Sequence, residues 1–232
     1  MERPSINERK PRLAPYEPPR VLGRSNLIVD DPLAAQILDR VGSLVLLVVL
    51  LPVMAIIALA ILLSSPGPVL FRQTRIGRGG AKFTCFKFRT MATNADERLR
   101  NLLSNDPEAR REWERDRKLR NDPRINSLGR FLRKSSLDEL PQLFNVLRGE
   151  MSLVGPRPIV EAEIPRYGRY FGHYCAVRPG ITGLWQISGR NDVHYRRRIA
   201  FDVIYVRKGR FGDNLRILVL TVPIVLNSKG SY

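Results

Sequence analysis

An adjacent pair of carboxylates, Asp138 and Glu139, is the part of this sequence whose residue types are best suited to chemistry. The pair lies within residues 135–143, SSLDELPQL. The chain around it is strongly basic, with 39 Lys and Arg residues against 22 Asp and Glu and a formal net charge of +17. Acidic side chains amid so much positive charge indicate chemistry on anionic, phosphate-bearing molecules.

The acidic pair also has a purely structural explanation. Ser136 is followed three residues later by Glu139, a pattern typical of a capping box at a helix start, where the helix dipole favours acids. The later motifs weaken that explanation, because each holds an arginine beside glycine or proline, and Arg recognises phosphate oxygens through two parallel hydrogen bonds. Together they predict a phosphoryl-transfer site, where positioning and charge neutralisation supply most of the rate. These motifs lie at residues 149–158, 178–183 and 189–191.

One apolar stretch, residues 41–63, carries no charged side chain. A helix of that length is about 35 Å long, enough to cross the hydrocarbon core of a membrane. Pro52 near its middle predicts a kink, so the helix either spans the membrane or returns to the side from which it entered. Six basic residues and no acid follow within residues 72–89, which places that flank in the cytoplasm.

The remaining chain is expected to form one domain, since 232 residues suffice for a core without disulfide support. Residues 69–90 predict a β-hairpin around a glycine-rich turn, and residues 95–119 predict one charged, solvent-facing helix. Residues 217–226 are apolar but too short to span and contain a proline, so they either lie in the membrane interface or pack into the core. Two separated cysteines and two histidines show no spacing for a disulfide framework or a zinc site.

Proline-rich residues 1–33 predict a disordered tail, because they show little apolar periodicity. We expect the membrane helix to occupy residues 34–64 and the catalytic domain residues 65–232.

Six ordered motifs resemble those of the bacterial sugar transferases, the monotopic phosphoglycosyl transferases, over roughly residues 36–232. The C-terminal motifs are similar to the transferases of rhizobial type that start exopolysaccharides with galactose or glucose 1-phosphate. The motifs are FRQTRIG (71–77), FKFRTM (86–91), SLDELPQ (136–142), SLVGPRP (152–158), RPGITG (178–183) and GRN (189–191).

The resemblance implies a mostly α-helical fold with a small β-hairpin. A re-entrant membrane helix, bent at Pro52, and interfacial amphipathic helices would support a compact cytoplasmic catalytic domain at the inner membrane. The sequence departs from the family pattern at two places. Ala35 and Gln36 replace a basic pair, which shifts headgroup anchoring to Arg40, and Leu51 replaces the serine that commonly precedes the proline.

The resemblance also implies a reaction in two half-steps between a UDP-hexose and undecaprenyl phosphate. Asp138 would be the nucleophile and a ligand of Mg²⁺, and the reaction would release UMP and yield a lipid-linked diphosphosugar. Glu139 would support the metal or proton transfer. Substrate-binding roles fall to Arg157, Arg190, Arg89 and Lys87.

Two other functions compete with this one. A single-span protein whose basic domain binds nucleic acid or acidic lipid explains the charge and the apolar stretch but gives the acidic pair no role. A membrane hydrolase of lipid-linked diphosphates would use water as the acceptor. Our preferred interpretation needs no nucleic acid, and the sequence leaves self-association and the choice between galactose and glucose open.

Overall fold

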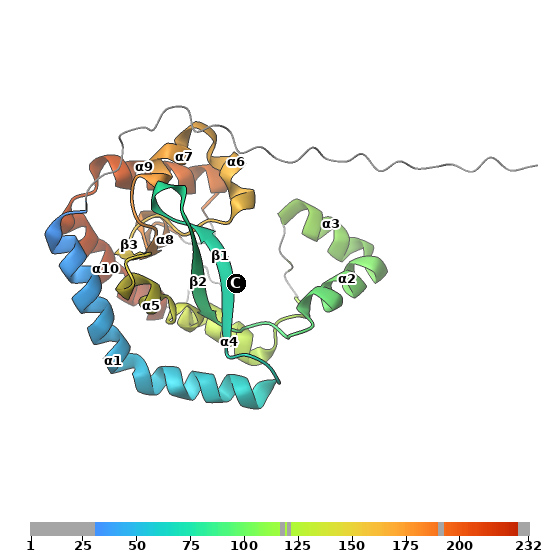
Figure 1. Cartoon of the computed structure of the whole chain (residues 1–232). Helices are drawn as coiled ribbons and strands as arrows, with labels where there is room; N and C mark the ends of the chain where they lie inside the picture. Colours follow the sequence, from blue (N-terminus) through green and yellow to red (C-terminus); the bar gives the residue numbers. More distant parts are fainter. Residues whose placement is uncertain (1–30, 117–118, 120–121, 190–192, 227–232) are drawn as a thin grey trace, which may run out of the picture.

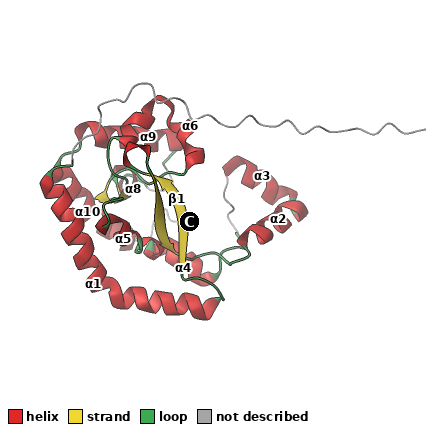
Figure 2. Ribbon diagram, in the orientation of Figure 1, coloured by secondary structure: helices red, strands yellow, loops and turns green. Residues whose placement is uncertain are grey.

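The computed structural model of the chain describes residues 31–116, 119, 122–189 and 193–226. Helices predominate in this part of the chain, with two small two-stranded sheets. Figure 1 shows the long helix α1 bordering the domain and shorter helices gathered around the hairpin β1–β2. The same balance of helix and strand is visible in Figure 2. The predicted mostly α-helical fold with a small hairpin is confirmed, whereas nearly all of the predicted tail lies outside the described residues.

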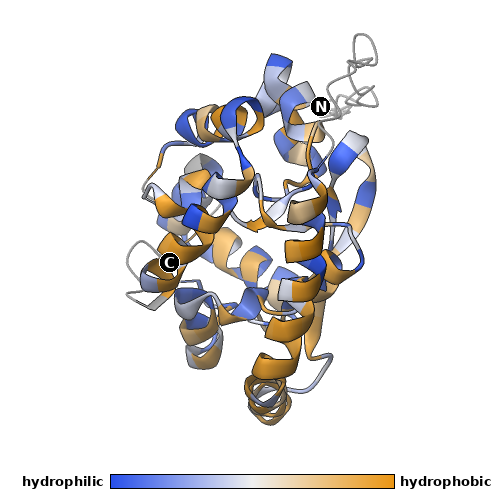
Figure 3. Ribbon diagram, turned by 90° about the vertical axis from the view of Figure 1, so that its left-hand side faces the viewer, coloured by the Kyte–Doolittle hydropathy of each residue, from blue (hydrophilic) through white to orange (hydrophobic). Residues whose placement is uncertain are grey.

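Helix α1 (Leu33–Ser64) is long and apolar enough to cross a membrane by length and composition. Pro52 lies inside it, and Figure 1 shows the helix turning sharply partway along its length. Figure 3, viewed from the side on which α1 lies in Figure 1, shows hydrophobic residues along most of the long helix and a mixture of hydrophobic and hydrophilic residues elsewhere. A narrow stripe faces the domain, namely Ala35, Asp39, Ser43, Leu47, Met54, Ile57 and Ile61. The helix therefore packs on the domain along one face and leaves a long apolar face uncovered.

The N-terminal half of α1 is fastened to the domain through Asp39. This buried carboxylate accepts hydrogen bonds from Ser152 Oγ (3.0 Å) and from the backbone N–H of Leu153 (2.8 Å). Its other oxygen pairs with the Arg178 guanidinium at 2.8 Å. The ion pair and the two further hydrogen bonds offset part of the hydration that this carboxylate loses on burial. Asp39 thereby fixes α1 to strand β3 (Ser152–Val154).

The predicted hairpin is confirmed. Strands β1 (Leu70–Ile76) and β2 (Lys82–Phe88) pair antiparallel, and a 3₁₀ turn, η1 (Arg78–Gly80), joins them. Gly79, at φ 67°, takes the left-handed conformation that glycine adopts most easily. Asn145 of helix α5 (Gln142–Leu147) satisfies the outer edge of β2, accepting from the N–H of Phe86 and donating to the carbonyl of Thr84. The hairpin is thus fixed against the helices beneath it.

The sequence predicts one helix over the charged segment 95–119, but the structure has two helices there. Helix α2 (Ala95–Asn105) ends before Asp106, and helix α3 (Pro107–Asp116) begins at Pro107. Proline lacks a backbone N–H and clashes with a preceding helical turn, so it breaks the segment but suits a first helical position. The Asp106 carboxylate accepts from the N–H groups of Glu108 and Ala109 and so caps α3. Figure 2 shows this helix pair standing apart from the rest of the domain.

Helix α10 (Phe211–Leu226) contains Pro223 and packs into the core along one face, whereas a place in the membrane interface stays a prediction. Ile217 is buried in the core, whereas Val219 and Val222 are exposed. Strands β3 (Ser152–Val154) and β4 (Gly180–Thr182) form a short parallel pair beside it. The other helices are α4 (Ser127–Ser135), α5 (Gln142–Leu147), α6 (Ile164–Tyr167), α7 (Phe171–Cys175), α8 (Leu184–Ile187) and α9 (Tyr195–Lys208), with 3₁₀ turns η2 (Leu137–Glu139), η3 (Glu161–Glu163) and η4 (Gly168–Tyr170).

Candidate active site

The acidic pair sits on the 3₁₀ turn η2, immediately after helix α4. Ser136 joins the two elements at φ 59°, the one positive φ among the described non-glycine residues. Such strain persists where the surrounding structure enforces it, and it concentrates at functional sites. The predicted capping box is wrong, because the Ser136 side chain makes no capping hydrogen bond and Glu139 pairs with Lys87 instead. Ser136 ends α4 and precedes η2, so the acidic pair lies in the first turn of this short 3₁₀ element without a side-chain cap.

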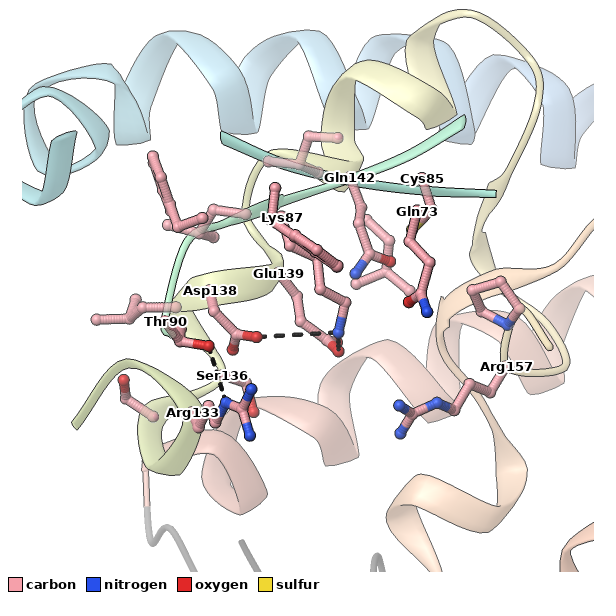
Figure 4. Close-up of a pocket in the computed structure, with 18 of the residues that line it drawn as sticks. Gln73, Cys85, Lys87, Thr90, Arg133, Ser136, Asp138, Glu139, Gln142 and Arg157 are labelled. Carbon is pink, nitrogen blue, oxygen red and sulfur yellow. Dashed lines mark hydrogen bonds and ion pairs between the residues drawn. The ribbon is translucent and has the colours of Figure 1, made fainter. Parts of the chain in front are cut away.

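Both carboxylates line a cavity of about 1120 Å³. Among the predicted site residues, Lys87, Arg89 and Arg157 line the same cavity. Figure 4 shows Asp138 and Glu139 approaching Lys87 from one side, with Arg157 reaching in from the opposite side. Segments distant in sequence therefore meet here: strand β2, turn η2 and the loop after β3.

Lys87 bridges the two acids. Its ammonium nitrogen lies 2.5 Å from Glu139 Oε1 and 3.8 Å from Asp138 Oδ2. A second cation, Arg133 of α4, donates from Nε to Thr90 Oγ1 at 2.8 Å, and its guanidinium faces Asp138 in Figure 4. Sequence reasoning gave Arg133 no role, although its place five residues before Asp138 in a basic helix was visible. Each of the two acidic side chains thus has a basic side chain close to it in the cavity.

The two carboxyl groups differ in electrostatic environment. Burial, followed by repulsion from Glu139, raises the pKa of Asp138 to about 6, against the opposing effect of Lys87, Arg133 and Arg157. For Glu139, burial acts to raise the pKa, but the positive charges of Lys87 and Arg157 act more strongly in the opposite direction. The net result is a pKa of Glu139 below its ordinary value. Glu139 is therefore the carboxyl group of the pair that stays ionised more readily. Asp138 is the more basic and more reactive carboxylate.

Arg157 presents an exposed guanidinium to the cavity from the loop after β3. A second arginine, Arg75 of β1, holds this loop in place by donating to the carbonyl of Pro158 at 2.8 Å and to Gln73 Oε1 at 2.6 Å. Arg75 is buried, and burial lowers the pKa of its guanidinium. Its Nε has no hydrogen-bond partner among the described residues. Arg75 thus supports the position of Arg157.

The other predicted arginines have different surroundings. Arg89 lines the cavity, but its guanidinium donates to the carbonyls of Ser65 (2.7 Å) and Pro66 (2.8 Å) at the end of α1. That is a structural role, and a contact with substrate stays a prediction. Arg178 lies outside the cavity lining and pairs with Asp39. Arg190 lies outside the described residues.

A divalent cation finds two candidate ligands here. Within the described part of the chain no group of three or more His, Cys, Asp or Glu side chains could hold a metal. Asp138 and Glu139 share the cavity. Mg²⁺ typically binds one or two carboxylates and completes its shell with water and substrate phosphates, so this pair suits Mg²⁺ together with a phosphate ligand. Cys85 and Cys175 are free thiols.

Comparison with known proteins identifies the family to which this chain belongs. The model of the bacterial sugar transferase family matches residues 31–228. The undecaprenyl-phosphate galactose phosphotransferase of Salmonella typhimurium is 50% identical over 194 residues, which cover 84% of this chain and 40% of that protein. ExoY of Rhizobium meliloti, an exopolysaccharide production protein, is 46% identical over 200 residues, covering 86% of this chain and 88% of ExoY.

A UDP-glucose:undecaprenyl-phosphate glucose-1-phosphate transferase of Caulobacter vibrioides is 41% identical over 208 residues, covering 86% of this chain and 72% of the relative. This chain therefore spans well under half of the Salmonella protein but most of the other two. The matched region includes the acidic pair and every cavity-lining segment. The chain belongs to the bacterial sugar transferase family.

Proposed function

We propose that this protein transfers hexose 1-phosphate, from UDP-galactose or UDP-glucose, to undecaprenyl phosphate and so starts the assembly of an exopolysaccharide. One observation carries the proposal: a paired carboxylate lies in a cation-lined cavity on a domain that also holds a membrane-length helix. The names of the relatives supply the substrate classes. The cavity supplies groups suited to a diphosphate.

The reaction proceeds in two displacements at one phosphorus atom. An ionised oxygen of Asp138 attacks the phosphorus that bears the sugar, and the bond from this phosphorus to the bridging oxygen breaks. UMP leaves with the bridging oxygen, and the hexose phosphate remains as an acyl phosphate. A phosphate oxygen of undecaprenyl phosphate then attacks the same phosphorus, and the Asp138 carboxylate leaves. Neither displacement requires a base, because both nucleophiles are anions.

Repulsion between the attacking carboxylate and the diphosphate is the main barrier that the site must reduce. Lys87 and Arg157 enter the cavity from opposite sides and are placed to bind the phosphate oxygens between them. Together with Lys87, Arg133 partly offsets the negative charge of the Asp138 carboxylate. Glu139 holds the Lys87 ammonium in place through its ion pair. The cations thus come from parts of the chain that the fold holds rigidly.

We include Mg²⁺ in the proposal, with Asp138 and Glu139 as the residues that would hold it. When bound, the ion would offset the negative charge of the diphosphate. Asp138 then still acts as the nucleophile, and Glu139 still holds the Lys87 ammonium in place.

The same proposal assigns α1 to the membrane as a re-entrant helix that exits on the cytoplasmic side of the inner membrane. Its bend, with Pro52 inside the helix, supports a return to the entry side. Exposed Phe131 and Phe144 on the neighbouring short helices suit the interface, because the apolar face of an interfacial helix, often with Phe or Leu, is buried at the boundary of headgroups and acyl chains. Cysteine labelling before residue 33 and near the C-terminus distinguishes the topologies. Labelling from the same side is expected, whereas opposite sides would mean a true span.

The activity has a direct test. Membranes containing the full chain are incubated with radiolabelled UDP-galactose or UDP-glucose, polyprenyl phosphate and Mg²⁺. We expect UMP release and transfer of label into lipid with one of the two sugars. If neither nucleotide sugar reacts with any acceptor, the proposal is wrong.

The same preparation tests the competing functions. Hydrolysis of an added lipid-linked diphosphosugar to hexose phosphate and polyprenyl phosphate, with no transfer from UDP-hexose, would support the hydrolase. Tight DNA binding with a steep salt dependence would support a basic nucleic-acid-binding domain, because phosphate contacts release counterions.

The raised pKa of Asp138 predicts the acid side of the pH profile. Only the ionised carboxylate is a nucleophile, and with its pKa at about 6 the group is mostly protonated below that pH. UMP release in the first displacement is therefore expected to fall by about tenfold per pH unit below pH 6, as for a single required ionisation. Rapid-quench measurement of UMP between pH 4.5 and 8 checks this. A rate that stays level down to pH 4.5 would contradict it.

Lys87→Gln is expected to slow UMP release at pH 7 by about 10- to 100-fold, as loss of one charged stabilising group typically does. It also removes the largest influence that lowers the pKa of Asp138, so the acid side of the profile should move to higher pH. Lys87→Arg keeps the charge and should restore part of the rate. Lys82→Gln is the control, because Lys82 lies on the same strand in an exposed pair with Glu161. An unshifted pH profile in Lys87→Gln would refute the bridging role.

A further inference from the structure

The cavity that holds the acidic pair also extends into an apolar region that the proposed chemistry does not use. This apolar arm runs between α1 and α10, and its walls include Leu46 and Leu50 from α1 and Leu218, Ile224 and Val225 from α10. The whole cavity exceeds the roughly 300–1,000 Å³ of a typical ligand pocket. One cavity therefore combines a cationic end at Asp138 with an apolar end between two helices.

The arm has little to offer a polar ligand. Its wall includes the hydroxyls of Thr182 and Thr221, but these hydrogen-bond each other at 2.8 Å, and Thr221 also donates to the Ile217 carbonyl. Their hydrogen-bonding needs are met without a ligand. An apolar chain that fills the arm therefore displaces water from Leu and Ile side chains without stranding either hydroxyl.

The helices that form the arm are also the ones with uncovered apolar faces. Leu46 is 40% exposed, and Val45 beside it is 53% exposed. On α10, Val222 is 58% exposed. The arm thus adjoins the surfaces of the chain most suited to contact with lipid.

We propose that the apolar arm binds the first isoprene units of the lipid acceptor and presents its phosphate to Asp138. This inference rests on the proposed function. Of the two substrates, only the acceptor joins a phosphate to a long apolar chain, so only it matches both ends of the cavity. The sugar nucleotide, which lacks such a chain, uses the cationic end alone. The acceptor can then enter from the membrane side, between α1 and α10.

Binding measurements test this without requiring turnover. Leu46→Trp and Ile224→Trp narrow the arm from its two walls, and Val45→Trp and Val222→Trp add the same side chain to neighbouring positions outside the cavity lining. The full chain in lipid nanodiscs is titrated with undecaprenyl phosphate and with a phosphate carrying a single isoprene unit. The release of UMP from the UDP-hexose is measured in parallel, without acceptor.

We expect both arm variants to bind undecaprenyl phosphate about tenfold more weakly and the single-isoprene phosphate within about twofold of the unsubstituted protein, a difference of roughly one power of ten in Kd. The two control variants should bind both ligands normally, and all four should release UMP normally. Unchanged undecaprenyl phosphate binding in both arm variants would overturn the inference, as would an equal loss for both ligands. Absence of UMP release from every protein would count against the proposed function alone, since the binding comparison stands without it.

Discussion

Asp138→Asn is expected to lower turnover by about 10⁴-fold or more, the scale seen when an enzyme loses its nucleophile. The amide has almost the same shape but cannot attack phosphorus as an anion, so the first displacement stops. UMP release and lipid labelling should disappear together, because both half-steps pass through the same carboxylate. Radiochemical assay of membranes with matched protein content measures both.

The variant is also expected to remain folded, which separates a chemical defect from a structural one. The pKa of Asp138 is raised in the folded protein, so its ionised form is disfavoured by folding and its protonated form is favoured. This contribution to stability is present at low pH and is lost as the pH rises through about 6. A neutral Asn should therefore melt no lower than the unsubstituted protein at pH 7. Glu161→Gln, at an exposed ion pair, is the control for activity, and full turnover in Asp138→Asn would exclude Asp138 as the nucleophile.

Asp39→Ala is expected to lower the free energy of unfolding by about 3–5 kcal/mol, the usual cost of removing one partner from a buried ion pair. The substitution leaves the Arg178 guanidinium with less compensation and removes the acceptor for Ser152 and for the N–H of Leu153. Helix α1 then loses its polar attachment to β3. Chemical denaturation in detergent micelles, followed by tryptophan fluorescence, measures the change.

The neighbouring acid provides a matched control. Asp31 also pairs with Arg178, at 2.8 Å, but it is less buried than Asp39. Asp31→Ala should cost clearly less, because Arg178 keeps its bond to Asp39 and no backbone N–H is stranded. Equal losses in the two variants would show that Asp39 has no special role in fastening α1.

Local patterns in the sequence predicted the elements whose cause is local. The hairpin follows from β-branched and aromatic residues on either side of glycines, and most of α1 follows from the uncharged apolar stretch of residues 41–63. The break between α2 and α3 was also visible locally, because an aspartate followed by proline both caps and starts a helix. The overall charge periodicity of residues 95–119 concealed it. Reading the charge pattern over the whole segment therefore missed the helix boundary that Asp106 and Pro107 indicate.

The site was predicted less completely, because its contacts are not local. The acidic pair and Lys87 were identified through motifs, yet their meeting depends on packing that brings strand β2 against turn η2. Arg178 was grouped with phosphate-binding arginines, since a guanidinium beside Pro and Gly looks the same whether its partner is a ligand or a buried acid. The partner, Asp39, lies 139 residues away. Nothing in either segment alone indicates that pair.

Mass spectrometry of the enzyme mixed with UDP-hexose, without any acceptor, is the most direct measurement of the central claim. The account predicts one equivalent of UMP and a hexose phosphate attached to the peptide that contains Asp138. Adding undecaprenyl phosphate should discharge that adduct into lipid. Formation of lipid product with no adduct at any stage, or UMP release only after acceptor is added, would contradict a covalent intermediate on Asp138.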